Sequence, residues 1–316
     1  MPRVSIVIPT YNCDRFLGRA VDTALSQSYT DHEIIVVDDG STDGTADLIA
    51  QYEQRVRYYR QSNRGVSAAR NLALDYATGE FIAYLDADDM WYPQKLEAQV
   101  AFLDTHKECG LVHTEVSVID EDDEILHLCF NQETKRSIPR GYCLTDLLRR
   151  CHIQTLTVME RRQCLDRIGG FDERLPIAQD YHHWIKVVGE GFAVGYIAEP
   201  LGKYRWRRGS LMANQGRLLE DLVLIYEGIL QGELNLQNVE KDDLGVIAKE
   251  LHLMHRRLAY LERTSAKFSQ AKERIGQLIR KHPGAIELYG DFLKICMREL
   301  LHRGRKFAAS NSRLSR

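Results

Sequence analysis

Hydrophobic and polar positions in the first 105 residues alternate between two periods. Short apolar runs bounded by polar turns predict strands at 4–9, 33–37, 56–60 and 81–85. Apolar residues at helical spacing between these runs predict helices at about 16–25, 45–54 and 66–77. Strands that alternate with helices are typical of a parallel α/β sheet. The turns after such strands meet at one sheet edge, where open α/β sheets bind ligands.

The segment from 111 to 203 repeats this pattern less regularly. Its predicted strands are 111–118, 125–130, 155–159 and 193–198, and its predicted helices are 161–168 and 180–190. An acidic turn at 120–124 is expected to be solvated, and a basic stretch, Lys203–Arg208, follows the last strand.

From about Asn214 the pattern is helical throughout. Apolar residues recur at helical spacing from Leu218 to Ile229, and later faces predict helices near 245–262, 267–280 and 284–301. The longest apolar candidate, Leu218–Leu230, contains three acidic residues and falls short of the ~20 apolar residues of a membrane-spanning helix. We therefore expect a small helical appendage.

Three carboxylates, Asp86, Asp88 and Asp89, directly follow the strand at 81–85. Packed together at a strand end they would repel one another unless a divalent cation with oxygen ligands, such as Mg²⁺ or Mn²⁺, lay among them. Taken alone, an Asp-X-Asp sequence is more often a solvated acidic turn. The remaining motifs decide between the two interpretations.

Five ordered segments resemble the family 2 glycosyltransferases, which are inverting enzymes of the GT-A fold. The segments are Val4–Asn12, Ile34–Asp43, Asn63–Asn71, Leu85–Asp89 and Gly169–Glu173 followed by Gln179-Asp180. The resemblance ends near residue 210. It implies an α/β nucleotide-sugar-binding fold with a Rossmann-like, mostly parallel sheet. We expect a glycosyltransferase domain at 1–213, with a nucleotide-binding half at 1–105 and an acceptor half at 106–213, and an all-helical region at 214–316.

The resemblance implies donor-binding roles for Pro9, Tyr11 and Asp39. Pro9 and Tyr11 match positions that enclose the nucleobase and ribose, although Tyr11 without this match would be an ordinary half-buried aromatic residue. Asp39 matches a carboxylate that accepts the uracil N–H. The neighbouring Asp38 is equally compatible with turn stabilisation in Asp-Asp-Gly-Ser.

A diphosphate and metal site is implied in the same way. Arg70 matches a position that contacts the donor pyrophosphate, and a guanidinium fork suits phosphate oxygens. Asp86 matches a residue that reaches the ribose or the outer metal shell, and Asp88 matches the direct ligand of Mg²⁺ or Mn²⁺. Such a cation stabilises the leaving diphosphate. Asp89 is expected to cap the helix that begins near Pro93.

Asp180 matches the second acid of the family's Glu-Asp motif and is the expected catalytic base. It would remove the proton of the acceptor hydroxyl, and a place near a helix start would help to keep it ionised. Gln179 departs from the family's Glu, and an N-cap role for Asp180 is the alternative. Gly169 and Gly170 would permit close backbone approach to a sugar.

Arg207 is a second departure, because relatives often carry a metal- or diphosphate-binding His at this position. Arginine cannot ligate a cation but can pair with the diphosphate, so metal dependence would be weaker. His182 and His183 could replace the missing His, although adjacent histidines on a helix point to different faces.

Composition sets the remaining limits. A net charge of −3 over 316 residues gives no reason to expect nucleic-acid binding. Seven scattered cysteines without a C-x-x-C pair indicate reduced thiols in a cytosolic protein, and no signal peptide is apparent. From Asp291 onward the tail has a net charge of +5, with seven Lys and Arg against two acidic residues. Such a run is usually a solvated face but could also contact anionic lipid.

The sequence therefore predicts a cytoplasmic, metal-assisted inverting glycosyltransferase, either soluble or peripheral at the inner membrane face. It would move a sugar from a UDP-linked donor to a glycan or lipid-linked glycan in bacterial surface-polysaccharide synthesis. One alternative is a nucleotidyltransferase, which would need an early Gly-rich loop and a phosphate-binding Lys. The other is a non-catalytic nucleotide-sugar-binding or scaffold protein, which only Gln179 and Arg207 favour.

Overall fold

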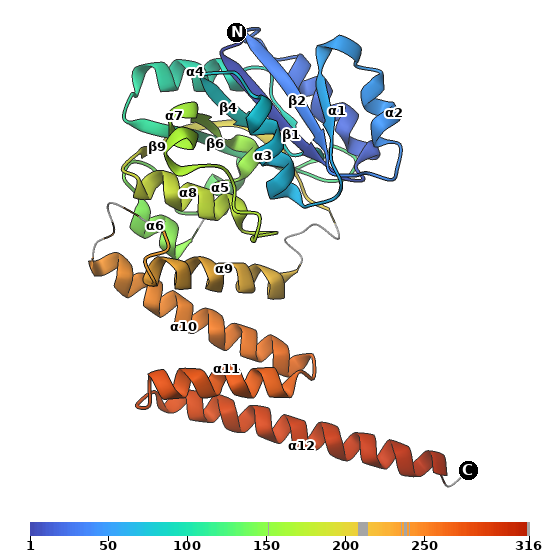
Figure 1. Cartoon of the computed structure of the whole chain (residues 1–316), viewed down its shortest axis with the longest axis vertical. Helices are drawn as coiled ribbons and strands as arrows, with labels where there is room; N and C mark the ends of the chain where they lie inside the picture. The colour runs from blue at the N-terminus through green and yellow to red at the C-terminus, as the bar shows by residue number, and fades with distance from the viewer. Residues whose placement is uncertain (151, 208–213, 235, 237–238, 240, 315–316) are drawn as a thin grey trace. The chain divides into compact units, whose positions relative to one another are not determined.

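The computed structural model forms two compact units (Figure 1). It describes residues 1–150, 152–207, 214–234, 236, 239 and 241–314, with side chains up to residue 302. The first unit comprises 1–213 with 234–243, and the second comprises 214–233 with 244–316. Within the described residues, no helix has both the length and the apolar character needed to cross a membrane. Six cysteines are free thiols, and Cys151 lies outside the described residues.

A single mixed sheet is the centre of the first unit, with strand order β3-β2-β1-β4-β8-β6-β9-β5 and β7 paired to β6. The strands are β1 (Val4–Thr10), β2 (His32–Asp38), β3 (Arg57–Arg60), β4 (Phe81–Tyr84), β5 (Met90–Trp91), β6 (Cys109–Ile119), β7 (Ile125–His127), β8 (Met159–Arg161) and β9 (Ala193–Arg205). Strands β3, β2, β1 and β4 are parallel, so their carboxyl ends share one edge. Strand β8 runs antiparallel between β4 and β6.

Helices of the first unit cover both faces of this sheet (Figure 1). They are α1 (Asp14–Leu25), α2 (Thr45–Ala50), α3 (Val66–Tyr76), α4 (Lys95–Thr105), α5 (Phe130–Glu133), α6 (Leu144–Arg149), α7 (Arg162–Ile168) and α8 (Gln179–Gly189), with 3₁₀ turns at Glu53–Arg55 and Thr155–Thr157. Because side chains alternate along a strand, Ile6 and Ile8 of β1 join the core under α1 and α4, and the other face of β1 and β2 meets α3. The predicted α/β fold with a mostly parallel sheet is confirmed.

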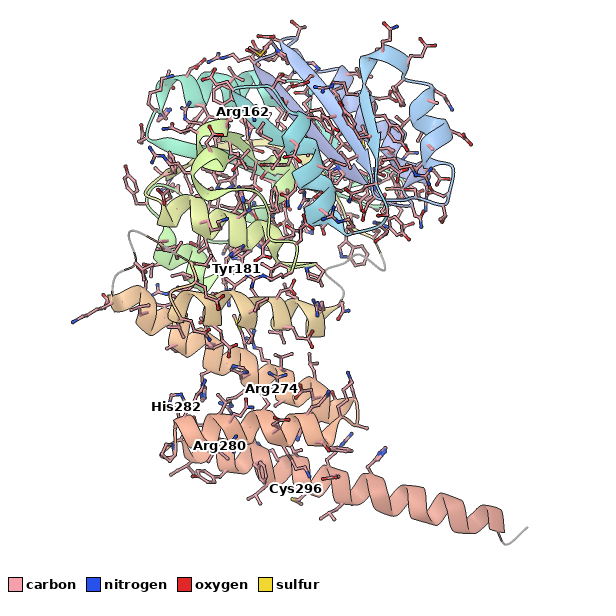
Figure 2. The ribbon with its side chains drawn as sticks, viewed as in Figure 1. Arg162, Tyr181, Arg274, Arg280, His282 and Cys296 are labelled. Carbon is pink, nitrogen blue, oxygen red and sulfur yellow. The ribbon has the colours of Figure 1, made fainter. Side chains whose placement is uncertain are left out.

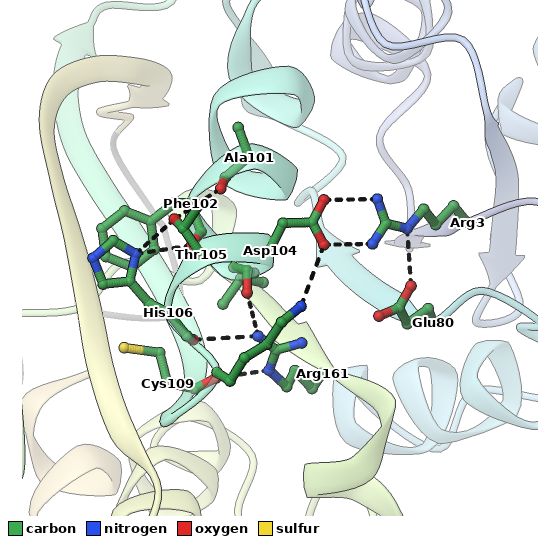
Figure 3. Close-up of polar contacts among 11 residues, drawn as sticks. Arg3, Glu80, Ala101, Phe102, Asp104, Thr105, His106, Cys109 and Arg161 are labelled. Carbon is green, nitrogen blue, oxygen red and sulfur yellow. Dashed lines mark hydrogen bonds and ion pairs between the residues drawn. The ribbon is translucent and has the colours of Figure 1, made fainter.

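Ion pairs stabilise the sheet at its amino edge, away from the strand ends that carry the motifs (Figure 3). Arg3, just before β1, donates to Asp104 of α4 through both terminal nitrogens and to Glu80, just before β4, at 2.9 Å. Arg161 at the end of β8 donates to the carbonyls of Leu103 and Cys109. These contacts fix the starts of β1 and β4 relative to α4, and the opposite edge is left for ligands.

Four parts of the middle segment differ from the prediction. The strand predicted at 125–130 ends at His127, and Phe130 begins the short helix α5. Residues 155–157 form a 3₁₀ turn, and only 159–161 belong to a strand. Strand β9 extends to Arg205 instead of ending at 198, because its register with β6 shifts near Pro200 and pairing then resumes. Helix α6 was not predicted, because its six residues are too short to show a period.

The second unit is helical, as the pattern predicts. Its helices are α9 (Gln215–Leu230), α10 (Lys241–Thr264), of which Leu244 onward belongs to this unit, α11 (Phe268–Lys281) and α12 (Ile286–Leu314). Helices α11 and α12 pack along each other around Phe268, Ile275, Leu288 and Ile295.

The segment 234–243 returns to the first unit. Leu236 lies over Gly189 so closely that a Cβ at this glycine would meet the Leu236 side chain at 2.5 Å. Asp243 accepts a hydrogen bond from the Thr145 hydroxyl. A cut at residue 213 would therefore remove contacts that belong to the sheet unit.

Candidate functional site

The turns after β1 and β2 interlock at the carboxyl edge of the sheet. Asn12 has a φ of +48°, a left-handed conformation that Asn tolerates better than most residues. Its side-chain oxygen accepts from the Thr42 N–H at 2.8 Å, and its backbone N–H donates to Ser41 Oγ at 2.9 Å. This turn places Pro9 within buried β1 and leaves the Tyr11 side chain 50% exposed, free to stack on a planar ligand.

Asp38 and Asp39 hold the neighbouring turns. Asp38 Oδ1 accepts from the Ser41 N–H at 2.7 Å, which confirms the turn-stabilising interpretation of this residue. Asp39 is buried, and its two oxygens accept from the backbone N–H groups of Arg64 and Gly65 at 2.8 and 2.7 Å. The Asp39 carboxylate thus anchors the loop that leads into α3.

Arg70 of α3 is the centre of a buried polar cluster. Its side chain is 3% exposed and donates to Asp86 Oδ1 at 2.5 Å and to Gln179 Oε1 at 3.0 Å. The guanidinium lies 5.4 Å from the centre of the Phe171 ring. Its Nε has no hydrogen-bond partner among the described residues, so the cation keeps one donor for a ligand. A Glu at 179 would have neutralised this cation further, whereas the neutral Gln179 leaves Asp86 as its ion-pair partner.

Asp180 lies in the first turn of α8, beside this cluster. Ala178 is the N-cap of that helix, so the N-cap interpretation of Asp180 is wrong. Asp180 Oδ2 accepts from the Thr155 hydroxyl at 2.7 Å. Burial raises the pKa of the Asp180 carboxyl above its ordinary value, and the Thr155 hydrogen bond and the Arg70 charge partly oppose this shift.

Asp88 and Arg207 form an ion pair in which Arg207 Nε donates to Asp88 Oδ2 at 2.6 Å. Burial, followed by the nearby Asp86 carboxylate, raises the pKa of Asp88, and Arg207 opposes the shift. The thiol of Cys13, in the turn after β1, has its pKa raised to about 12 by burial and then by Asp88. The carboxylates after β4 and the turn after β1 therefore share one electrostatic environment.

Asp89 does not cap a helix. It is buried, and its Oδ1 accepts from the Arg205 backbone N–H at 2.7 Å. Helix α4 begins at Lys95 with Gln94 as its N-cap, so the predicted capping role is wrong. Arg205 also donates to the Asp88 carbonyl at 2.7 Å, so β9 holds the acidic turn in place through backbone groups of both segments.

Helix α8 is anchored from both sides. His183 is fully buried, and its ring hydrogen-bonds Glu160 of β8. Its partner is therefore Glu160 and not the Asp88 site, where it could have replaced the missing His. Tyr84 of β4 donates to the same carboxylate. On the other side of the helix, the Tyr181 hydroxyl, labelled in Figure 2, donates to the Leu147 carbonyl at 2.7 Å. These contacts fix the helix start that carries Gln179 and Asp180.

Gly170 has a different role from the one predicted. A Cβ there would lie 2.3 Å from Asn71 Oδ1, so the close approach is to a side chain of α3. Asn71 Oδ1 accepts from the Phe171 N–H at 2.8 Å, and Asn71 Nδ2 donates to the Phe171 carbonyl at 2.9 Å. Gly169 has a φ of +73°, which favours glycine. These hydrogen bonds join the motif Asn63–Asn71 to the motif Gly169–Glu173.

The site fits a divalent cation only if a substrate supplies further ligands. In the part of the chain that the structure describes, no three His, Cys, Asp or Glu side chains lie close enough to hold a metal ion. The Asp88 carboxylate already pairs with one positive group, the guanidinium of Arg207. Mg²⁺ is usually bound by one or two carboxylates together with substrate phosphates, a pattern that Asp88 and Asp86 can meet.

Comparison with known proteins identifies this arrangement. The model of the family described as "Glycosyl transferase family 2" matches residues 5–162. TuaG of Bacillus subtilis (strain 168), named as a teichuronic acid biosynthesis glycosyltransferase, is 32% identical over 236 residues, which cover 72% of this chain and 88% of TuaG. The curated relatives thus include a protein named for cell-wall polysaccharide synthesis.

Solved structures share the fold at lower identity. S. aureus TarS 1–349 in complex with UDP-GlcNAc is 18% identical, with a TM-score of 0.66 over 96% of this chain and 92% of that one. The mannosyltransferase PcManGT from Pyrobaculum calidifontis in complex with GDP-Man and Mn²⁺ is 20% identical, with a TM-score of 0.61 over 98% and 81%. From the family match and the TuaG alignment, the chain belongs to glycosyl transferase family 2.

Proposed function

We propose that the chain transfers a sugar from a UDP-linked donor to a glycan acceptor with inversion, in the synthesis of a bacterial surface polysaccharide. The enclosed cluster of Arg70, Asp86 and Asp180 carries this proposal. It combines a buried cation that keeps one unused donor with a carboxylate whose pKa is raised. The naming of TuaG for teichuronic acid synthesis supports the class of product.

Asp180 acts as the base in this proposal. Inversion requires a group that takes the acceptor proton while the acceptor oxygen attacks the sugar carbon, on the face opposite the diphosphate. Burial brings the pKa of Asp180 toward neutrality, where a carboxylate accepts a proton more readily. The Thr155 hydroxyl fixes its orientation.

Arg70 and Arg207 bind the donor diphosphate. Arg207 exchanges its contact with Asp88 for phosphate oxygens, and Asp88, with Asp86 beside it, would then hold Mg²⁺ or Mn²⁺. When bound, that cation stabilises the negative charge on the leaving diphosphate. Support comes from the single ion pair that occupies Asp88 and from the Mn²⁺ in the PcManGT complex.

Pro9, Tyr11 and Asp39 bind the nucleoside. Exposed Tyr11 stacks on the base. Asp39 accepts from two backbone N–H groups and from Gln61 Nε2 at 2.7 Å, and its Oδ2, which accepts only one of these bonds, retains acceptor capacity for a uracil N–H. The TarS complex with UDP-GlcNAc favours uridine, whereas PcManGT is bound to GDP-Man.

Residues 1–213 perform the chemistry in this proposal, and 214–316 determine location. The enzyme works in the cytoplasm, peripheral to the membrane, where a lipid-linked glycan would be its acceptor. Family membership is at odds with the nucleotidyltransferase alternative.

A thermal-shift screen tests the donor class. UDP-, GDP- and dTDP-sugars are added to the whole protein with and without Mn²⁺, and the melting temperature is measured. We expect UDP-sugars to raise it most, with Mn²⁺ adding to the shift, because a ligand stabilises the folded state that it binds. Arg70→Met should abolish the shift, and Arg167→Met on α7 is the matched control. A shift without sugar transfer or donor hydrolysis would instead favour the non-catalytic scaffold.

A further inference from the structure

Helix α12 exposes a continuous row of large apolar side chains, which we name the α12 stripe. Its members are Ile286, Tyr289, Leu293, Met297, Leu300 and Leu301, which are between 43% and 82% exposed. They recur at intervals of three and four residues and therefore lie along one side of the helix. An apolar row of this length is rare on a surface that contacts only water.

The core of the second unit does not account for the stripe. Leu288 and Ile295 of the same helix are buried in the cluster with α11. These two residues lie on the opposite side of α12 from the stripe, because they are two residues from Ile286 and Leu293. Up to residue 302, where its side chains are described, helix α12 thus has two apolar sides, and one of them packs within the second unit while the other is exposed.

The charge around the stripe is positive. Lys294 and Arg298 are exposed beside it, and Lys294 also pairs with Asp291 of the same helix at 3.3 Å. The nearby acids are already paired inside the unit, with Asp291 bound to Arg256 at 2.8 Å and Glu299 bound to Lys272 at 2.8 Å. Residues 244–316 contain sixteen Lys and Arg against six Asp and Glu, a net charge of +10 in a chain whose overall charge is −3. In Figure 2, Arg280 lies on α11, the helix that packs against α12, whereas the charge of Arg274 on the same helix is paired with Glu262 at 2.8 Å.

We propose that the α12 stripe docks on a membrane surface that carries anionic lipid headgroups. Leucine, isoleucine and tyrosine side chains would enter the boundary between headgroups and acyl chains, and the flanking Lys294 and Arg298 would meet the lipid phosphates.

Charge favours a lipid surface over the other occupants of an apolar helix face. Two copies of a +10 segment repel each other, which opposes pairing of the stripe with a second chain. An anionic polymer would satisfy the cations but would leave the six apolar side chains in water. A membrane with acidic headgroups satisfies both features at once.

Vesicle flotation of the full chain, without donor or acceptor, tests this proposal. We expect the protein to float with phosphatidylglycerol-containing vesicles and to stay in solution with pure phosphatidylcholine vesicles. The double variant Leu293→Gln/Leu300→Gln should weaken binding at least about tenfold, because it removes two inserted side chains while keeping good helix formers. The matched control is Leu126→Gln/Leu128→Gln, which removes two exposed leucines of the first unit and should bind as the unchanged chain does.

A second variant pair separates charge from apolar insertion. Lys294→Gln/Arg298→Gln should bind several-fold more weakly at low salt, and the difference should shrink as salt is added. Circular dichroism checks that each variant keeps its helices. Absence of flotation by the unchanged chain would overturn the proposal. Sedimentation as a dimer that Leu293→Gln/Leu300→Gln dissociates would do so too, because a second copy would then cover the stripe. Donor binding does not enter this assay, so failure here is distinct from failure of the proposed transfer.

Discussion

Two groups of aspartates follow parallel strands on either side of β1, at the same sheet edge, and their surroundings differ. After β2, Asp38 accepts from the Ser41 N–H of its own turn, and Asp39 accepts from the Arg64 and Gly65 N–H groups of the loop that leads into α3. After β4, Asp86 pairs with the guanidinium group of Arg70, and Asp88 pairs with that of Arg207. Backbone donors cannot leave, whereas an arginine side chain can exchange one anion for another. In the proposed function, the first group therefore builds the edge, with Asp39 also accepting from the nucleobase, and the second group meets the diphosphate and its cation.

Asp180 belongs with the second group, and its substitution should have the largest effect on catalysis. Asp180→Asn keeps the shape of the side chain and an acceptor for Thr155 but removes the base. We expect turnover to fall by roughly 10² to 10⁴, with donor affinity nearly unchanged. Asp166→Asn, an exposed aspartate on α7, is the control and should retain full turnover. A loss of donor affinity with turnover preserved would place Asp180 in the donor site instead.

Asp88→Ala and Arg207→Gln break the same ion pair from opposite sides. If Asp88 holds a cation with the diphosphate, Asp88→Ala should lower transfer by roughly 10² to 10³ and abolish the effect of Mn²⁺ on donor binding. Arg207→Gln should lose less activity and depend more steeply on Mn²⁺, because the competing guanidinium is gone. Titration of both variants with Mn²⁺ at fixed donor concentration separates the two roles. If the two variants lost equal activity and responded equally to Mn²⁺, the Asp88–Arg207 pair would be a structural salt bridge without a role in metal binding.

Asp39→Asn should lower the stability of the folded protein, whereas Asp88→Ala should mainly lower activity. One Asn oxygen cannot accept at both places that Asp39 serves, so a part-buried N–H at Arg64 or Gly65 would lose its partner. We expect the free energy of unfolding to fall by about 1–3 kcal/mol in urea titrations. The exposed Asp31→Asn on the loop before β2 provides the baseline. Unchanged stability of Asp39→Asn would remove the distinction between the two groups.

The smallest effect concerns stability and pH at Asp180. Its raised pKa means that the folded protein holds the proton more tightly than the unfolded chain does, relative to the ordinary value of 3.8. The stability of the unchanged protein therefore falls as pH rises from the ordinary pKa to the raised one. Asp180→Asn lacks this loss, so its stability relative to the unchanged protein should rise through that window and level off above the raised pKa. Parallel melting curves from pH 4 to pH 7 measure the difference, and a constant difference would contradict the raised pKa.

The sequence predicted the regular part of the fold because local periodicity determines it. Strands β1, β2 and β4 and the helices between them each show a clean period, so their order and the shared site edge follow. The resemblance then selected Arg70, Asp86 and Asp180, which the structure brings together.

Contacts between distant segments could not be predicted in this way. Asp89 was expected to cap a helix nearby, but its partner is Arg205, 116 residues later. Thr155 was placed in a strand, and its hydroxyl instead orients Asp180 from a 3₁₀ turn. Gly170 was related to a sugar, and it meets Asn71. The local sequence around each of these residues does not indicate which distant side chain it contacts, because these contacts form only when the sheet assembles.

The stereochemistry of sugar release tests the central claim most directly. UDP-GlcNAc, an α-linked donor, is incubated with the whole protein and Mn²⁺, and proton NMR identifies the first anomer of the released sugar before it equilibrates. An inverting site with Asp180 as its base should release the β anomer, and Asp180→Asn should slow this release by roughly 10² or more. Initial release of the α anomer, or release that Asp180→Asn leaves unchanged, would contradict the account.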